Sequence, residues 1–84
     1  MDLLWSKKGW GDYLWWQDNN IKIVSKINTI LKSLQRGERP IGKSEILSHS
    51  GEGLRSARLD KENRLIYKIE PYAIRIVSCR GHYE

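Results

Sequence analysis

The last residues of the chain carry side chains suited to acid–base chemistry. His82 and Tyr83 follow a β-branched segment, Ile74 to Ser78, which predicts a strand running almost to the end of the sequence. Chain ends usually fray, but a strand that ends in an imidazole and a phenol can direct both toward one surface site. Histidine is the side chain best suited to proton transfer near neutral pH. Taken alone, these two residues leave a frayed polar tail as an equal alternative.

Two arginines lie where a hairpin would bring them together. Leu54 to Leu59 and Arg64 to Ile69 alternate with a period of two, and residues 60–63 between them predict a turn. That turn would place Arg58 opposite Arg64, or nearly so. Like charges directly opposite on a hairpin are destabilising, and a bridging anion would relieve the repulsion. Two solvated arginines explain the pattern about equally well.

A carboxylate completes a set of groups that is suited to RNA cleavage. Glu45 follows the glycine-containing polar loop of residues 35–43. With the arginines, His82 and Tyr83, it would give one sheet surface a base, two cations, an acid and a phenol. A base can remove the proton of a ribose 2′-OH, a cation can stabilise the phosphate, and an acid can protonate the departing 5′-oxygen. No metal is required, because the nucleophile is intramolecular. Spacing alone does not show that these groups converge.

Two helices are predicted in the first half of the chain. Lys7 to Gln17 form the first, in which Trp10, Tyr13, Leu14 and Gln17 follow helical spacing and are expected to be mostly core. Trp15 and Trp16 cannot both point the same way. The second helix is capped by Asn19 or Asn20. Its apolar stripe consists of Ile23, Val24, Ile27, Ile30, Leu31 and Leu34.

The strands predict an α+β fold. Asp2 to Trp5 form a short first strand, Glu45 to Leu47 a second, and Ala73 to Arg80 the last one, after the two strands of the arginine hairpin. The order is one strand, two helices and then three or four antiparallel strands. Two helices on one face of a small sheet would bury both apolar surfaces. Residues 1–84 are therefore expected to form one small domain.

Composition narrows the classes of partner and site. The formal net charge of +5 favours an anionic partner, such as nucleic acid, an anionic membrane or an acidic protein. The single Cys79 excludes an internal disulfide and is expected to pack as a small apolar residue, and only two histidines argue against a zinc site. No cofactor is expected. The absence of a signal peptide or long apolar run predicts a cytoplasmic protein, and of the possible anionic partners a membrane is not expected.

The chain resembles the YoeB family of bacterial toxins, within the RelE/ParE superfamily. The shared motifs occur in the right order over nearly the full length. They are Leu3-Leu4-Trp5-Ser6, Trp10-Gly11-Asp12-Tyr13-Leu14, Trp16-Gln17, Val24-Ser25-Lys26-Ile27-Asn28, Gly42-Lys43-Ser44-Glu45, Asn63-Arg64-Leu65-Ile66-Tyr67 and Cys79-Arg80-Gly81-His82-Tyr83. The resemblance implies a compact RelE/ParE-like, microbial RNase-like fold with a twisted antiparallel sheet.

The resemblance also implies an activity. YoeB toxins belong to type II toxin–antitoxin systems and cleave mRNA in the ribosomal A site, which inhibits translation and arrests growth. Each is held inactive by a cognate antitoxin of the YefM/Phd-like kind, and the toxins tend to form homodimers. Carried over to this sequence, Glu45 matches the general base, His82 the general acid and Arg64 the arginine that stabilises the scissile phosphate. The positions that match substrate-binding residues are Arg58, Tyr83 and Lys43.

Several residues depart from the family pattern. Ser44 replaces a common proline, Ala57 one of two paired arginines, Asn63 a histidine and Gly81 a bulky residue. Gly81 is expected to loosen the backbone that positions His82. Two alternatives follow. Besides the active endoribonuclease, the chain could be a non-catalytic relative that acts by binding, as the ParE-like gyrase inhibitors do, or a toxin that has drifted and binds its antitoxin without cleaving RNA.

Overall fold

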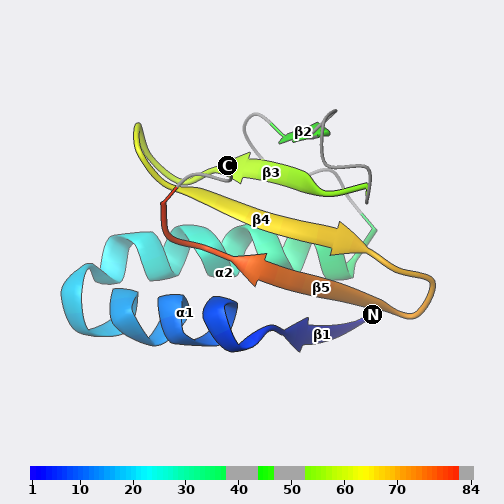
Figure 1. The fold of residues 1–84 in the computed structure, drawn as a ribbon, viewed down its shortest axis with the longest axis horizontal. Coiled ribbons are helices and arrows are strands. Elements are labelled where there is room, and N and C mark those ends of the chain that lie inside the picture. Colours follow the sequence, from blue (N-terminus) through cyan, green and yellow to red (C-terminus); the bar gives the residue numbers. More distant parts are fainter. Residues whose placement is uncertain (38–43, 47–52, 82–84) are drawn as a thin grey trace.

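The computed structural model describes residues 1–37, 44–46 and 53–81, with residues 44–46 described for their backbone. Within these residues two helices and five strands form along the chain (Figure 1). Their bounds are β1 Asp2–Trp5, α1 Lys7–Asn19, α2 Ile21–Gln35, β2 Ser44–Ile46, β3 Arg55–Arg58, β4 Arg64–Ile69 and β5 Ala73–Ser78. This arrangement confirms the predicted order of elements.

The strands form one mixed sheet with the order β1-β5-β4-β3-β2. The pairs β2–β3, β3–β4 and β4–β5 are antiparallel, as expected. β1 instead pairs in parallel with β5, so the first and last strands of the chain are neighbours. Both helices pack on the same face of the sheet (Figure 1). The predicted α+β fold is confirmed, and the parallel β1–β5 pair is the feature that the sequence pattern did not predict.

Element ends follow local hydrogen bonding. The bounds of β1 and β4 agree with prediction, and Asn20 rather than Asn19 caps α2, accepting a hydrogen bond from the Lys22 N–H at 3.1 Å. The prediction that the last strand runs to Arg80 was wrong, since β5 ends at Ser78. Both polar groups of the next backbone unit, that of Cys79, bond to side chains of α1 instead of a strand.

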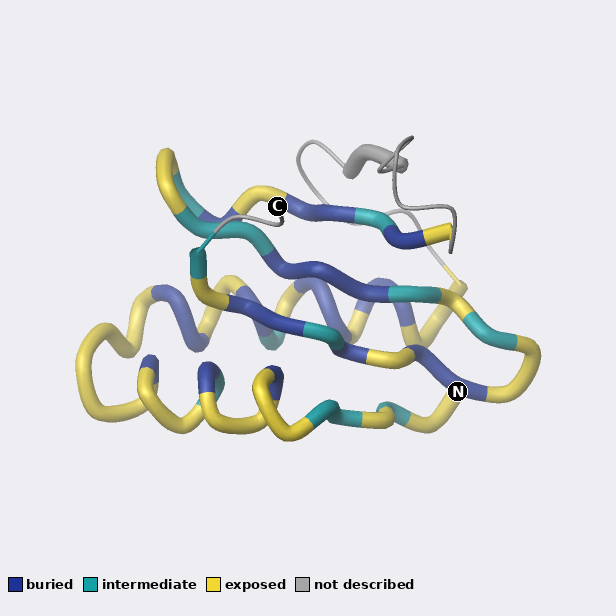
Figure 2. Tube along the Cα trace, viewed as in Figure 1, coloured by how far each residue is buried: buried dark blue, intermediate teal, exposed yellow. Residues whose placement is uncertain are grey.

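The second helix buries the predicted stripe. All six residues of the stripe are buried and belong to the hydrophobic core. They meet Leu65, Tyr67, Ile74 and Ile76, the residues of β4 and β5 that point toward the helices and are at most 1% exposed. Figure 2 shows this buried layer along α2, β4 and β5. The period-3.6 and period-2 patterns therefore locate the core correctly.

The first helix packs through a different face from the one predicted. Trp10, Leu14 and Gln17 are exposed, and Tyr13 is half-buried, so the expectation that this face is core was wrong. The face toward β5 instead consists of Gly9, Asp12 and Trp16. Glycine allows close approach there: a Cβ at Gly9 would lie 2.8 Å from the carbonyl oxygen of Ile76. A helix that lies this close to a strand uses small and hydrogen-bonding residues rather than a stripe of large apolar ones.

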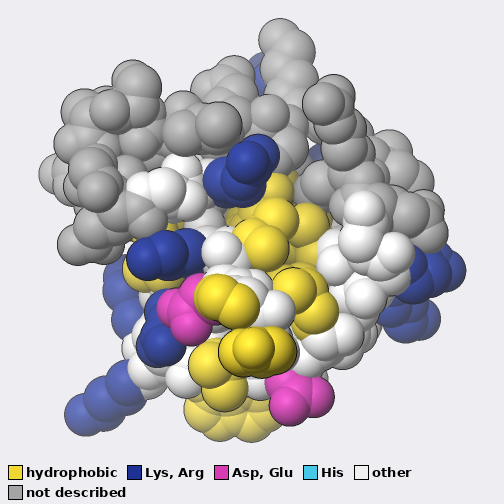
Figure 3. All heavy atoms as spheres, turned by 90° about the vertical axis from the view of Figure 1, so that its right-hand side faces the viewer, with side chains coloured by type: hydrophobic (Ala, Val, Ile, Leu, Met, Phe, Trp, Pro, Cys, Tyr) yellow, Lys and Arg dark blue, Asp and Glu magenta, His cyan; other side chains and the backbone are white. Residues whose placement is uncertain are grey.

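Exposed hydrophobic side chains gather at one end of the sheet. Figure 3 views the end that carries the N-terminus and the β4–β5 turn, where hydrophobic side chains gather between Lys and Arg side chains. The exposed hydrophobic residues of the N-terminus, β1, the end of β4 and the turn are Met1, Leu4, Ile69 and Tyr72. The β3–β4 turn lies at the far end (Figure 1). Neither described helix is both long and apolar enough to cross a membrane.

Candidate active site

The two predicted arginines face each other on the β3–β4 hairpin. Arg58 and Arg64 are direct partners in the antiparallel register, which confirms the prediction from the turn. Their neighbours Ala57 and Leu65 are buried toward the helices. Because side chains alternate along a strand, both arginines lie on the opposite face, which has no helix among the described residues and is called the helix-free face. The half-buried Arg64 donates from Nη1 to the hydroxyl of Ser56 at 3.4 Å.

This pair is suited to binding an anion. Among the described residues no carboxylate forms an ion pair with either guanidinium. The exposed Arg58 donates from Nε to the backbone carbonyl of Asp60 at 3.2 Å, which holds the side chain near the turn. Two like charges at directly opposed positions cost a few tenths to about 1 kcal/mol. A bound phosphate would convert that repulsion into attraction, since guanidinium groups bind phosphate oxygens in fork geometry.

The structure also places the backbone of the predicted base. Glu45 lies in β2 directly opposite Ser56 of β3, and Ser56 in turn lies opposite Ile66 of β4. Glu45 is thus on the strand next to the arginine hairpin. Its side chain is outside the described part of the structure, as are Lys43, His82 and Tyr83. The roles of these four residues therefore stay predictions.

The segment that leads to His82 is attached to α1. The Cys79 N–H donates to Oδ2 of the buried Asp12 at 3.0 Å, and the Cys79 carbonyl accepts from Nε1 of Trp16 at 2.7 Å. The Nζ of Lys8 forms an ion pair with the same Asp12 oxygen at 2.9 Å. The guanidinium of Arg80 then lies 4.2 Å from the centroid of the Trp15 ring. Cys79 is therefore held by the buried side of α1, and Arg80 contacts its exposed side.

Gly81 is attached to the arginine hairpin. Its N–H donates to Oδ1 of Asn63 at 2.8 Å, and its carbonyl accepts from the Arg64 N–H at 3.1 Å. Its φ of +87° lies in the left-handed region that favours glycine. Both backbone polar groups of Gly81 are bonded, but the backbone of His82, which Gly81 was expected to loosen, lies outside the described residues, so that expectation stays a prediction. In Figure 1 this last coloured segment runs beside the β3–β4 turn.

Sequence reasoning missed three residues that hold this segment, namely Asp12, Trp16 and Asn63. A signal for Asp12 and Trp16 was present, since both share a helix face with Gly9 at spacings of three and seven. The signal was obscured because the larger aromatic residues of the neighbouring face looked more like core. Nothing local in the sequence connects Asn63 with Gly81, which lies 18 residues away.

Cys79 is a buried structural residue rather than a nucleophile. Its side chain is fully buried, which confirms the expected apolar packing, and its Sγ lies 3.6 Å from the Gly9 carbonyl oxygen. Burial, followed by the negative charge of Asp12, raises the pKa of the Cys79 thiol to about 12. The thiolate is therefore scarce at neutral pH.

The thiol is expected to resist modification in the folded protein. At pH 8 a soluble disulfide reagent should react with Cys79 at least about tenfold more slowly in buffer than in denaturant, because only the thiolate attacks. Cys79 is the only cysteine, so absorbance of the released thiol reports on it alone. Equal rates in the two solutions would contradict the buried position.

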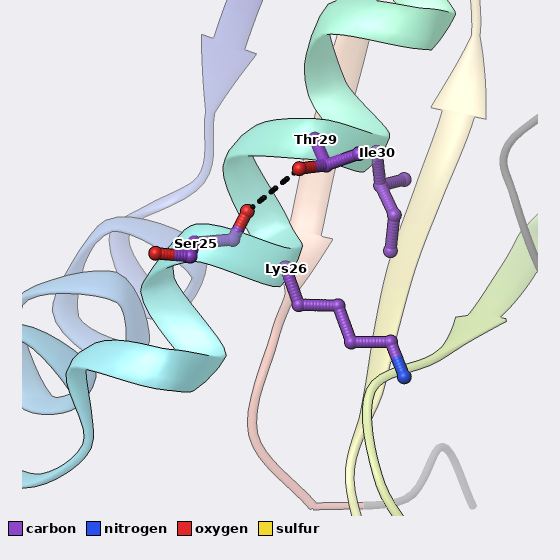
Figure 4. Close-up of a pocket in the computed structure, with 4 residues that line it drawn as sticks. All are labelled: Ser25, Lys26, Thr29 and Ile30. Carbon is purple, nitrogen blue, oxygen red and sulfur yellow. Dashed lines mark hydrogen bonds between the residues drawn. The ribbon is translucent and has the colours of Figure 1, made fainter.

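A small hollow on α2 lies apart from these groups. It has a volume of about 210 Å³ and is lined by Ser25, Lys26, Thr29 and Ile30 (Figure 4). The lysine amino group donates to the carbonyl of Leu59 at 2.9 Å, which ties α2 to the end of β3. The polar group of this hollow therefore has a structural role, because Lys26 joins α2 to the sheet. Within the described ranges no three His, Cys, Asp or Glu side chains gather in a way that could hold a metal ion.

Comparisons with known proteins identify relatives over the whole chain. Residues 5–83 match the family described as YoeB-like toxin of bacterial type II toxin–antitoxin system. Toxin YoeB of Escherichia coli O6:H1 is 42% identical over 84 residues, which cover 99% of this chain and 100% of that protein. The YoeB dimer from Staphylococcus aureus has a TM-score of 0.90 at 38% identity and covers 99% of this chain and 98% of its own. The YoeB–YefM complex from the same organism has a TM-score of 0.87 at 39% identity, with coverage of 99% and 98%.

Proposed function

Because this chain belongs to the YoeB-like toxin family of bacterial type II toxin–antitoxin systems, we propose that it is a ribosome-dependent endoribonuclease. It cleaves mRNA in the ribosomal A site and so inhibits translation and growth. The observation that supports this most is the opposed Arg58–Arg64 pair. The pair lies on the helix-free face and has no carboxylate partner among the described residues. The backbone N–H of Arg64 also donates to the carbonyl of Gly81, the residue before His82.

The proposed mechanism needs no metal, because the ribose 2′-OH attacks the adjacent phosphate within one molecule. Glu45 removes the 2′-OH proton, and Arg64 with Arg58 stabilises the charge that develops on the phosphate. His82 protonates the departing 5′-oxygen, and Tyr83 positions it or the substrate. The products are a 5′-hydroxyl end and a 2′,3′-cyclic phosphate, or the 3′-phosphate formed from it by hydrolysis.

The surplus of positive charge supports binding to the ribosome. The chain carries 15 Lys and Arg against 10 Asp and Glu. Basic residues that neutralise rRNA phosphates release counterions, so affinity for the ribosome falls as salt rises. Lys43 is proposed as one of the residues that contact the substrate near the base.

The proposed protein partner is an antitoxin of the YefM/Phd-like kind, acting in the cytoplasm. The Staphylococcus aureus relative is described in a complex with YefM and also as a dimer, which supports an antitoxin partner and a possible homodimer. An acidic segment that is disordered until it binds can cover a large basic surface. Trp10 and Trp15 are exposed on α1 and are proposed as contacts for it, whereas the buried Trp16 takes no part.

The experiment adds the purified chain to translating ribosomes with a defined A-site codon and maps mRNA 5′ ends by primer extension. Wild type should create a new end within the A-site codon, and His82→Ala and Glu45→Ala should not create it. Both variants should also relieve growth arrest while keeping the wild-type unfolding curve, because neither residue belongs to the described core.

Three outcomes would contradict the proposal. Full arrest by the Glu45→Ala/His82→Ala double variant would exclude the acid–base mechanism. Intact mRNA despite tight ribosome binding by wild type would point to a toxin that has lost cleavage. Intact mRNA without ribosome binding, together with broken DNA in expressing cells, would point to a gyrase-directed relative.

A further inference from the structure

We propose that Asn63 is a positioning residue for cleavage, which fixes the backbone entering His82 by joining Gly81 to the charged turn at Asp60. This inference rests on the proposed function, in which His82 is the acid. Asn63 would not touch the substrate. It would act by determining where the C-terminal segment begins relative to Arg64, its neighbour in the chain.

Asp60, Asn63 and Gly81 form a hydrogen-bonded unit, called the joint below. Both the oxygen and the nitrogen of the Asn63 side-chain amide make hydrogen bonds in it. Its Oδ1 accepts the Gly81 N–H at 2.8 Å. Its Nδ2 donates to both carboxylate oxygens of Asp60, each at 3.0 Å. The orientation of the amide is determined by these partners, since a flipped amide would place two donors together at Gly81 and oxygens together at Asp60.

The carboxylate of Asp60 is a rigid and charged anchor for the Asn63 side chain. Its Oδ1 also accepts the backbone N–H groups of Glu62 at 2.8 Å and Asn63 at 2.7 Å. Partial burial raises the pKa of Asp60, but these backbone bonds and the Asn63 amide outweigh it, so the net pKa lies below its usual range. An ionised carboxylate makes stronger hydrogen bonds than a neutral one. The turn therefore holds the Asn63 side chain in one orientation.

At Gly81 the joint also bonds to Arg64, the proposed phosphate ligand. The Gly81 carbonyl accepts the Arg64 N–H at 3.1 Å, so the residue before the proposed acid and the proposed phosphate ligand share one hydrogen bond. The two bonds on Gly81 fix its position against the hairpin, while its φ of +87° determines the direction in which the chain continues. An error of about 1 Å in such positioning can reduce the rate on the order of a hundredfold.

The joint is separate from the hydrophobic core. Asn63 and Gly81 are half-buried, and neither belongs to the apolar cluster under the helices. Its loss should therefore change the rate of the chemical step more than substrate binding or the global fold. This difference distinguishes a positioning role from a merely structural one.

A reciprocal exchange of the two side chains tests the proposal. Asn63→Leu removes the side-chain bonds to Gly81 and to Asp60, Asn63→Asp opposes two carboxylates, and Asp60→Asn replaces one of the two acceptor oxygens with a second amide donor. The Asp60→Asn/Asn63→Asp double variant restores an amide–carboxylate pair in reverse, with an oxygen still available to Gly81. Each single variant should lower kcat for A-site cleavage on the order of a hundredfold, with KM changed less than about threefold. The double variant should recover most of kcat, and Glu62→Gln in the same turn should match wild type.

Amide hydrogen exchange of Gly81, followed by NMR on the full chain, gives a readout independent of activity. Its N–H should be protected in wild type and in the double variant and unprotected in Asn63→Leu. Wild type that cleaves mRNA while the single variants keep its kcat would overturn this inference alone. A Gly81 amide that stays protected in Asn63→Leu would also overturn it. Wild type that fails to cleave would contradict the proposed function, and exchange at Gly81 would still decide whether Asn63 holds the backbone.

Discussion

Replacing Arg64 with alanine is expected to slow A-site cleavage by about 10³-fold, the upper range for removal of one group that stabilises transition-state charge. Arg64 is half-buried on the helix-free face and has the Ser56 hydroxyl as its polar side-chain partner at 3.4 Å. Among the described residues its guanidinium is oriented by this bond and meets no carboxylate. Single-turnover cleavage on a ribosome complex measures the loss. Thermal unfolding should change little, because the charged group lies outside the core.

Lysine at the same position should restore little of the rate. A guanidinium binds two phosphate oxygens in a planar fork, whereas an ammonium acts as a point charge on a flexible stem. If Arg64→Lys cleaves nearly as fast as wild type, the role of Arg64 is general electrostatic attraction. If it remains close to Arg64→Ala, the geometry of the fork matters.

Arg75 provides the matched control. It is an exposed arginine on β5, paired with Glu70 at 2.6 Å near the opposite end of the sheet. The hydrogen bond and charge of Glu70 raise the pKa of Arg75. Arg75→Ala removes the same formal charge from the chain and should leave the cleavage rate within about twofold, since exposed ion pairs contribute little. Equal losses in Arg64→Ala and Arg75→Ala would contradict a specific role for Arg64.

The second large effect is expected from Gly9→Ala, which should lower the free energy of unfolding by about 2 kcal/mol. The new Cβ would lie 2.8 Å from the Ile76 carbonyl oxygen and 3.2 Å from both Ile76 Cγ2 and Ser6 Oγ. The closest of these atoms is backbone, so no rotamer change removes the overlap. α1 would have to move away from β5, and the bonds from Asp12 and Trp16 to Cys79 would lengthen.

Gly11→Ala is the control in the same helix. A Cβ there would meet no atom within 4 Å, so alanine should stabilise the protein by about 0.5–1 kcal/mol through its higher helix propensity. Urea unfolding of both variants measures the difference. If Gly9→Ala were as stable as Gly11→Ala, the close approach of α1 to Ile76 would be wrong.

The sequence alone determined the parts of the molecule that depend on neighbouring residues. The stripe of α2, the bounds of β4 and the opposition of Arg58 and Arg64 were all predicted correctly. Each follows from a short-range rule: helical period, strand period or the geometry of a four-residue turn. Resemblance of ordered motifs identified the family and the α+β fold as well.

Tertiary structure alone decided which face of α1 is buried and how the C-terminal segment is held. The bonds from Asp12 and Trp16 to Cys79 span 67 and 63 residues. The parallel pairing of β1 with β5 has a similar separation. Such contacts have no local periodicity, because they depend on where a distant strand ends and on which backbone groups it leaves unpaired. A buried N–H or carbonyl must find a partner, and in this fold the first helix supplies it.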